Sequence, residues 1–221
     1  MDDQRTQFLE GTAIALAVFG ILLYEEPSAE RLGSLAGEGF FSEMPLAGAT
    51  PRIDEGIGLL EEWAAQAGAK APQETAAGLS AEWFRLFVGA GEPAAPPWAS
   101  YYLERDPVLF SKSTLGVRQH YAAHGLELER KYHEPDDHLG LMLQFLSVVA
   151  AKENEALCAG AGEGAAALKD ERQGFVSTYI LPWVGTWQQR VDASSTGPFY
   201  RGLAILVSEM VALIAADAEM P

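Results

Sequence analysis

The chain has 221 residues, of which 48% are hydrophobic, and this is enough material for a globular protein with a sizeable core. Its 31 Asp and Glu residues outnumber its 15 Lys and Arg residues, which gives a net charge of −16. This charge excludes a sequence-independent grip on nucleic-acid phosphates and favours a cationic partner, although solubility alone would also account for it.

The single cysteine, Cys158, excludes an intramolecular disulfide framework and is typical of a reducing compartment. The longest apolar run, residues 12–24, is shorter than the roughly 20 residues that span a bilayer, so we interpret it as a buried helix. The chain begins Met-Asp-Asp-Gln-Arg, without the basic start of a signal peptide. We therefore expect a cytoplasmic protein with no stable membrane insertion.

Apolar residues recur at helical spacing from end to end, without sustained strand alternation or hairpin turns. The sequence therefore predicts an all-α, single-domain helical bundle. Prolines and glycines set most of the expected helix limits, since proline opens or precedes a helix and glycine often ends one. Helices are expected at residues 4–25, 29–36, 51–67, around 80–87, 113–124, 134–157, 165–190 and 197–216.

Two segments are expected to interrupt this helical pattern. Residues 89–98 form a Gly/Pro-rich loop, because proline lacks the N–H that a helix needs, and the loop ends at Trp98. Residues 158–164 form a flexible connector, and no Gly-Lys-Ser/Thr follows it as a phosphate loop requires. Between them, Asp106 and Pro107 have the residue types of a helix cap and first helical position.

Residues 134–138, Glu-Pro-Asp-Asp-His, directly precede an apolar run. Proline is favoured at the first position of a helix, so Pro135 predicts a helix start. Asp136 and Asp137 would then lie in the first turn, where the helix dipole stabilises carboxylates. His138 would lie at the edge of the buried face. Ordinary helix-start chemistry explains the segment as well as a binding role does.

Several pieces of the sequence resemble the TorD/DmsD family of chaperones for molybdenum-containing oxidoreductases. The family signature Glu-Pro-x-Asp-His has all four fixed positions present at residues 134–138. The Pro-Pro-Trp at 96–98 and the Leu-Phe at 109–110 are closer to the DmsD branch. The other matching positions are 97–100, 108–110, 113–115, Arg118, Gly140, Leu143 and 199–203.

The resemblance implies a chaperone rather than an enzyme, with no cofactor of its own. Such a protein binds the twin-arginine signal peptide of a molybdopterin-containing oxidoreductase subunit and assists cofactor insertion before export. That signal has a cationic start and an apolar middle, so a receptor needs carboxylates beside an apolar groove. The candidate signal-peptide-binding residues are Trp83, Phe84, Pro97, Trp98, Ser100, Glu134, Asp136, Asp137 and His138.

We assign roles to these residues by their chemistry. Trp83, Phe84 and Trp98 would line the groove, although core packing explains Trp83 equally well. Asp136 or Asp137 would pair with an arginine, whose planar fork fits a carboxylate. Arg118 is expected to be a structural partner for an acid of residues 134–138. His138 would orient a carboxylate or mark the binding surface.

Two other functions remain open. A hydrolase would use Asp136, Asp137 and His138 as acid and base groups, although no nucleophile motif accompanies them. A helical adaptor would bind a folded partner instead of a signal peptide. No metal site is expected, because His133 and His138 lack i, i+4 spacing. The client enzyme, the oligomeric state (monomer or exchanged dimer) and guanine-nucleotide binding are left open, and no P-loop supports a nucleotide site.

Overall fold

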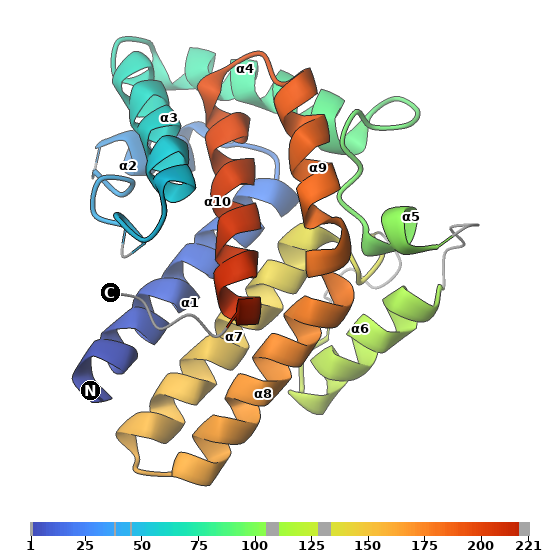
Figure 1. Cartoon of the computed structure of the whole chain (residues 1–221). Helices are drawn as coiled ribbons and strands as arrows, with labels where there is room; N and C mark the ends of the chain where they lie inside the picture. Colours follow the sequence, from blue (N-terminus) through green and yellow to red (C-terminus); the bar gives the residue numbers. More distant parts are fainter. Residues whose placement is uncertain (1, 38, 45, 105–110, 128–133, 217–221) are drawn as a thin grey trace. The chain divides into compact units, whose positions relative to one another are not determined.

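The computed structural model describes residues 2–37, 39–44, 46–104, 111–127 and 134–216 (Figure 1). Within these ranges the chain forms ten α-helices, one π-helical turn and an isolated β-bridge, which confirms the predicted all-α fold class. The described chain divides into two compact units. Unit 1 consists of residues 2–24, 97–183 and 214–216, and unit 2 of residues 25–96 and 184–213. That these act as one domain in solution stays a prediction.

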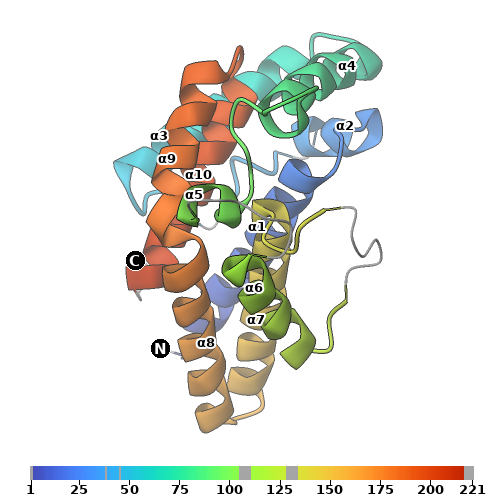
Figure 2. The same cartoon turned by 90° about the vertical axis from the view of Figure 1, so that its right-hand side faces the viewer.

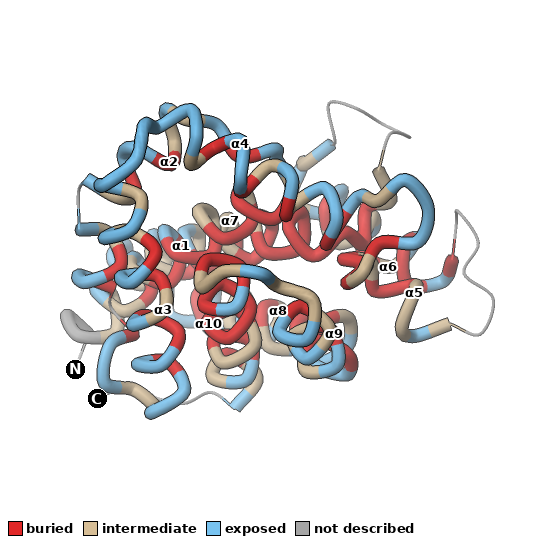
Figure 3. Tube along the Cα trace, turned by 90° about the horizontal axis from the view of Figure 1, so that it is seen from above, coloured by how far each residue is buried: buried red, intermediate tan, exposed pale blue. Residues whose placement is uncertain are grey.

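Unit 1 is built around α7. Its helices are α1 (Asp2–Tyr24), α5 (Ala99–Leu103), α6 (Lys112–Ala123), α7 (Leu139–Cys158) and α8 (Gly162–Tyr179). Figure 1 shows α7 between α1 and α8, and Figures 1 and 2 both show a short turn joining α7 to α8. The first half of α7 is almost entirely buried, as the red trace in Figure 3 indicates.

Two glycines allow α1 and α7 to approach closely. A Cβ atom at Gly140 would lie 2.6 Å from the carbonyl oxygen of Gly20, and a Cβ atom at Gly20 would lie 2.6 Å from that of Gly140. Leu16 and Phe19 of α1 and Leu143 of α7 are buried close to these glycines in sequence. Gly140 belongs to the sequence pattern around residues 134–138, so helix packing explains why that position is glycine.

Unit 2 contains three helices before residue 84, one π-helical turn and the greater part of two later helices. They are α2 (Ala29–Gly37), α3 (Pro51–Ala67), α4 (Pro72–Trp83), η1 (Phe84–Val88), α9 (Leu181–Ser194) and α10 (Pro198–Ala216). Helix α3 begins as predicted, with Pro51 in its first turn and the side chain of Thr50 accepting a hydrogen bond from the N–H of Ile53.

A second pair of glycines joins α3 to α10. A Cβ atom at Gly202 would lie 2.8 Å from the carbonyl oxygen of Gly56. On the same two helices, the rings of Trp63 and Phe199 pack edge to face with centroids 4.6 Å apart. The Phe-Tyr-Arg-Gly-Leu motif at residues 199–203 therefore supplies the close contact of α10 with α3.

The long helix predicted for residues 165–190 is wrong, since the structure has two helices there. Helix α8 ends at Tyr179 and α9 begins at Leu181. Pro182, the second residue of α9, explains the break, because it has no N–H to donate to a carbonyl oxygen of α8 and its ring clashes with the carbonyl four residues earlier. The connector before α8 is also shorter than predicted, since α8 already begins at Gly162.

The helix predicted around residues 80–87 has one largely buried face: Leu79, Leu86 and Phe87 have little exposed surface, whereas Trp83 is half-buried. The predicted cap at Asp106 and Pro107 lies outside the described residues, as do the matching residues 108–110 and His133.

Among the described residues, two helices are long and apolar enough to cross a membrane by length and composition alone. They are residues 5–24 of α1 and the whole of α10, both with a mean hydropathy of 1.7. The first segment is longer than the apolar run of residues 12–24, which alone was judged too short to span a bilayer. Within the protein, 50% and 61% of the two windows are buried, and core helices of soluble proteins pass the same test. The two helices are therefore weak evidence for membrane insertion.

Candidate functional site

In unit 1, residues 134–138 are joined to residues 97–99 by backbone hydrogen bonds. The N–H of Leu139 donates to the carbonyl oxygen of Pro97 at 2.7 Å, and the N–H of Ala99 donates to that of Asp137 at 3.1 Å. These bonds form an antiparallel bridge between Trp98 and His138. The segment is therefore not helical: α7 begins at Leu139, and the predicted start at Pro135 is wrong.

The carboxylate of Asp137 is completely buried, with 0% exposure. One oxygen accepts a hydrogen bond from the N–H of Ser100 at 2.6 Å, and the other accepts one from the hydroxyl of Thr114 at 3.2 Å. Burial raises the pKa of Asp137, although these hydrogen bonds act in the opposite direction. The side chain thus holds the starts of α5 and α6 against residues 134–138.

Asp136 is paired inside the chain. Arg118 donates from Nε to a carboxylate oxygen of Asp136 at 2.9 Å, and only 7% of that side chain is exposed. The buried hydroxyl of Tyr121, whose pKa burial raises, donates to the backbone carbonyl oxygen of Asp136 at 2.9 Å. The prediction that Arg118 is a structural partner for an acid of this segment is confirmed.

His138 is the N-cap of α7. Its Nδ1 accepts a hydrogen bond from the N–H of Gly140 at 3.0 Å, so the neutral ring carries its proton on Nε2. Burial lowers the pKa of His138 to about 3. The ring packs edge to face against Tyr24, with centroids 5.2 Å apart, and against Trp98, with centroids 6.1 Å apart. His138 is thus a neutral structural group at pH 7.

Trp98 and Glu134 are the more accessible members of the site in unit 1. Both are half-buried, and the indole Nε1 of Trp98 donates to Glu134 at 3.2 Å. Pro97 and Ser100 are buried beside them in sequence. The structure therefore brings together seven of the nine predicted site residues, but only this pair has appreciable exposed surface.

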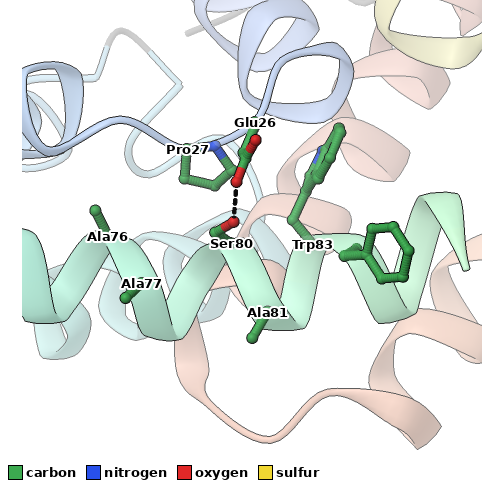
Figure 4. A pocket seen from close by; sticks show the side chains of 8 residues that line it. Glu26, Pro27, Ala76, Ala77, Ser80, Ala81 and Trp83 are labelled. Carbon is green, nitrogen blue, oxygen red and sulfur yellow. Dashed lines mark hydrogen bonds between the residues drawn. The ribbon is translucent and has the colours of Figure 1, made fainter.

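The remaining two predicted residues, Trp83 and Phe84, line a hollow in unit 2 with a volume of about 650 Å³ (Figure 4). Phe84 is 46% exposed, which is high for a large apolar side chain. The other lining residues are Glu26, Pro27, Ala76, Ala77, Ser80 and Ala81.

Helix α4 gives this hollow an apolar, shallow wall. Ala76, Ser80 and Trp83 lie on one helical face, and Figure 4 shows all three pointing toward the segment of Glu26 and Pro27. The small side chains of α4 leave room for the hollow, and Trp83 closes it at one end. The helix becomes a π-helical turn at Phe84, and such turns are frequent at functional sites.

Sequence reasoning missed Glu26, Pro27 and the alanines of the hollow. The available signal was the repetition of small residues at helical spacing, Ala76, Ser80 and then Ala77, Ala81, each row ending at an aromatic residue. Glu26 could not be found this way, because it reaches α4 only through the fold of unit 2. Among the described residues, no group of three or more His, Cys, Asp or Glu side chains is arranged to hold a metal ion.

Comparison with known proteins gives the family. The family model described as nitrate reductase delta subunit matches residues 50–189, which is more than half of the chain. The chain belongs to the TorD/DmsD family. Its similar proteins are named as chaperones and not as enzymes.

The TorD/DmsD relatives match over part of their length. The Tat proofreading chaperone DmsD of Salmonella typhimurium is 28% identical over 143 residues, which cover 65% of this chain. The chaperone protein TorD of a Psychrobacter species is 41% identical over 70 residues, or 32% of this chain. The chain spans 63% of the length of the first relative and 32% of the second.

A solved structure shares the fold. The redox enzyme maturation protein of Archaeoglobus fulgidus has a TM-score of 0.54 and 20% sequence identity, with 91% of this chain and 93% of that chain covered. At this identity the likeness supports the helical fold alone.

Proposed function

We propose that the chain is a cytoplasmic chaperone that binds the twin-arginine signal peptide of a molybdopterin-containing oxidoreductase subunit and assists cofactor insertion before export. Membership of the TorD/DmsD family, whose members are soluble proteins, supports the proposal. So does the name of the Salmonella relative, a Tat proofreading chaperone.

The observation that carries the proposal is the apolar hollow of unit 2. A signal peptide has an apolar middle segment, and its receptor must offer exposed apolar surface that a soluble protein otherwise avoids. The hollow offers Trp83 and the exposed ring of Phe84 beside small side chains. Its volume of about 650 Å³ is within the usual range of roughly 300–1,000 Å³ for ligand sites.

Within unit 1, Trp98 and Glu134 are the predicted binding residues that remain accessible. Asp136, Asp137 and His138 contribute indirectly, because their hydrogen bonds hold the segment to which Trp98 is bridged. This arrangement also weighs against the hydrolase alternative, since general acid and base groups must reach a substrate and these three side chains are buried.

Calorimetric titration with a synthetic twin-arginine signal peptide tests the proposal. The wild-type protein should bind the peptide, and Phe84→Ala should weaken binding about tenfold, since removing a large apolar contact costs 1–3 kcal/mol or so. Val88→Ala is the matched control, because Val88 is 37% exposed in the same π-helical turn and does not line the hollow.

A second test uses a cell extract. The immobilised protein should retain an immature oxidoreductase with its signal peptide intact and lose it when the signal peptide is deleted. Absence of peptide binding by the wild type, together with retention of the leaderless enzyme, would favour the adaptor alternative and contradict the proposal.

A further inference from the structure

Glu26 places an exposed carboxylate at the edge of the hollow in unit 2 (Figure 4). It lies between α1 and α2, and its Oε1 accepts a hydrogen bond from the hydroxyl of Ser80 on α4. This bond fixes the side chain beside the wall that carries Trp83. An anionic group is thus held at the edge of a surface whose other lining residues, apart from Ser80, are apolar.

The charge of Glu26 is not neutralised inside the described part of the chain, where it forms no ion pair. The adjacent Glu25, by contrast, pairs with Arg31 at 2.5 Å. Asp136 is occupied by Arg118, and Asp137 has no exposed surface. An arginine from a ligand can therefore reach Glu26 without displacing a cation of the protein.

We infer that Glu26 selects the cationic start of the signal peptide: an arginine pairs with this carboxylate while neighbouring apolar residues of the peptide occupy the hollow. The inference rests on the proposed function and names Glu26 as the group that recognises the positive charge of the signal peptide. The guanidinium fork matches a carboxylate and also stacks on aromatic faces, so an arginine at this edge meets both Glu26 and an indole wall.

The test compares two peptides on three proteins, with Glu134→Gln of unit 1 as a fourth that tests the other accessible acid of the predicted site. One peptide carries the twin-arginine signal, and the other has both arginines replaced by glutamine. The proteins are the wild type, Glu26→Gln and Glu30→Gln. The glutamine introduced by Glu26→Gln keeps an acceptor for Ser80 and loses only the charge. Glu30 is an exposed acid in the first turn of α2 that does not line the hollow, so Glu30→Gln controls for net charge.

Glu26→Gln should bind the twin-arginine peptide about fivefold more weakly than the wild type, as expected for loss of one accessible ion pair. It should bind the glutamine peptide as tightly as the wild type does. Glu30→Gln should match the wild type for both peptides. Calorimetry at fixed ionic strength gives the affinities, and circular dichroism checks the fold.

The possible failures differ. If the wild type prefers the twin-arginine peptide and Glu26→Gln keeps the full preference, the inference is overturned while the proposed function stands. Loss of the preference in Glu134→Gln instead would move charge recognition to unit 1 and would also overturn it. A wild type that binds neither peptide would overturn the proposed function itself.

Discussion

Asp137 and His138 have buried side chains that accept hydrogen bonds within the protein. Asp137 accepts from Ser100 and Thr114, and His138 caps α7 through Gly140. A buried acceptor that is removed leaves its donors without partners, which costs about 1–3 kcal/mol per group. The acidic appearance of residues 134–138 therefore reflects structural anchoring more than an exposed binding surface.

Protonation of His138 should destabilise the protein in acid. Its folded-state pKa is about 3, below the value of 6.5 in the unfolded chain, so the unfolded state binds more protons between these values. Stability is therefore full above pH 6.5 and falls as pH decreases toward 3. His138→Asn should reduce the loss of unfolding free energy on acidification by a few kcal/mol, because each pKa unit is worth about 1.4 kcal/mol.

Urea unfolding measured from pH 7.5 down to about pH 4 gives the comparison. Asparagine is a good N-cap residue, so it keeps an acceptor for Gly140 without titrating in this range. The readout is the slope of unfolding free energy against pH, which lost ring packing with Tyr24 does not change. Equal slopes in wild type and variant would show that His138 is not the titrating group.

The sequence predicted which residues of unit 1 lie together but not how accessible they are. Glu-Pro-x-Asp-His and Pro-Trp-Ala-Ser were expected to act together, and the bridge of Trp98 with His138 joins them. Their burial depends on backbone pairing between distant segments, which no local pattern reveals. Glu26 was missed for the same reason, since its contact with Ser80 is tertiary.

At the level of elements, helices were predicted well where a local signal sets their limits. Pro51 at the start of α3 is such a signal, and the structure confirms it. The start of α7 was misplaced because Pro135 is equally compatible with a turn, and the bond from Leu139 to Pro97 decides between them. Pro182 was also a local signal for a helix limit, but apolar residues recur at helical spacing on both sides of it, so a single helix was predicted.

The close contact of α3 with α10 at Gly56 and Gly202 should make the protein's stability sensitive to a larger residue there. Gly202→Ala should lower the free energy of unfolding by about 1–3 kcal/mol, because the new methyl group would lie 2.8 Å from the backbone oxygen of Gly56. Gly58→Ala is the control on α3, where nothing lies within 4 Å of an added Cβ atom.

Urea unfolding should show Gly58→Ala unchanged or more stable by up to about 1 kcal/mol, since alanine favours helix over glycine. The two variants have the same chemical change and opposite expected signs. A Gly202→Ala protein as stable as Gly58→Ala would mean that α3 and α10 can move apart at little cost, so close packing would not explain the glycine in residues 199–203.

At the scale of the whole molecule, the net charge of −16 acts on any approaching cation before contact is made. Among the residues that line the hollow only Glu26 is acidic, and pairs such as Asp136 with Arg118 are internal. Their summed field still attracts a twin-arginine peptide. Long-range charge should therefore govern the association rate, whereas Glu26 and the hollow should govern the dissociation rate.

Salt should separate these two contributions. The screening length is about 8 Å at physiological ionic strength and about 30 Å at 0.01 M. Association of the twin-arginine peptide should therefore be markedly slower at physiological ionic strength than at 0.01 M. Stopped-flow fluorescence of a labelled peptide measures the rate. The glutamine peptide should show a much weaker salt dependence, because it carries less charge for the field to act on.

Phe84→Ala should leave the salt dependence of association unchanged and raise the dissociation rate, since it removes contact without altering charge. An association rate independent of salt would rule out steering and leave solubility as the role of the charge.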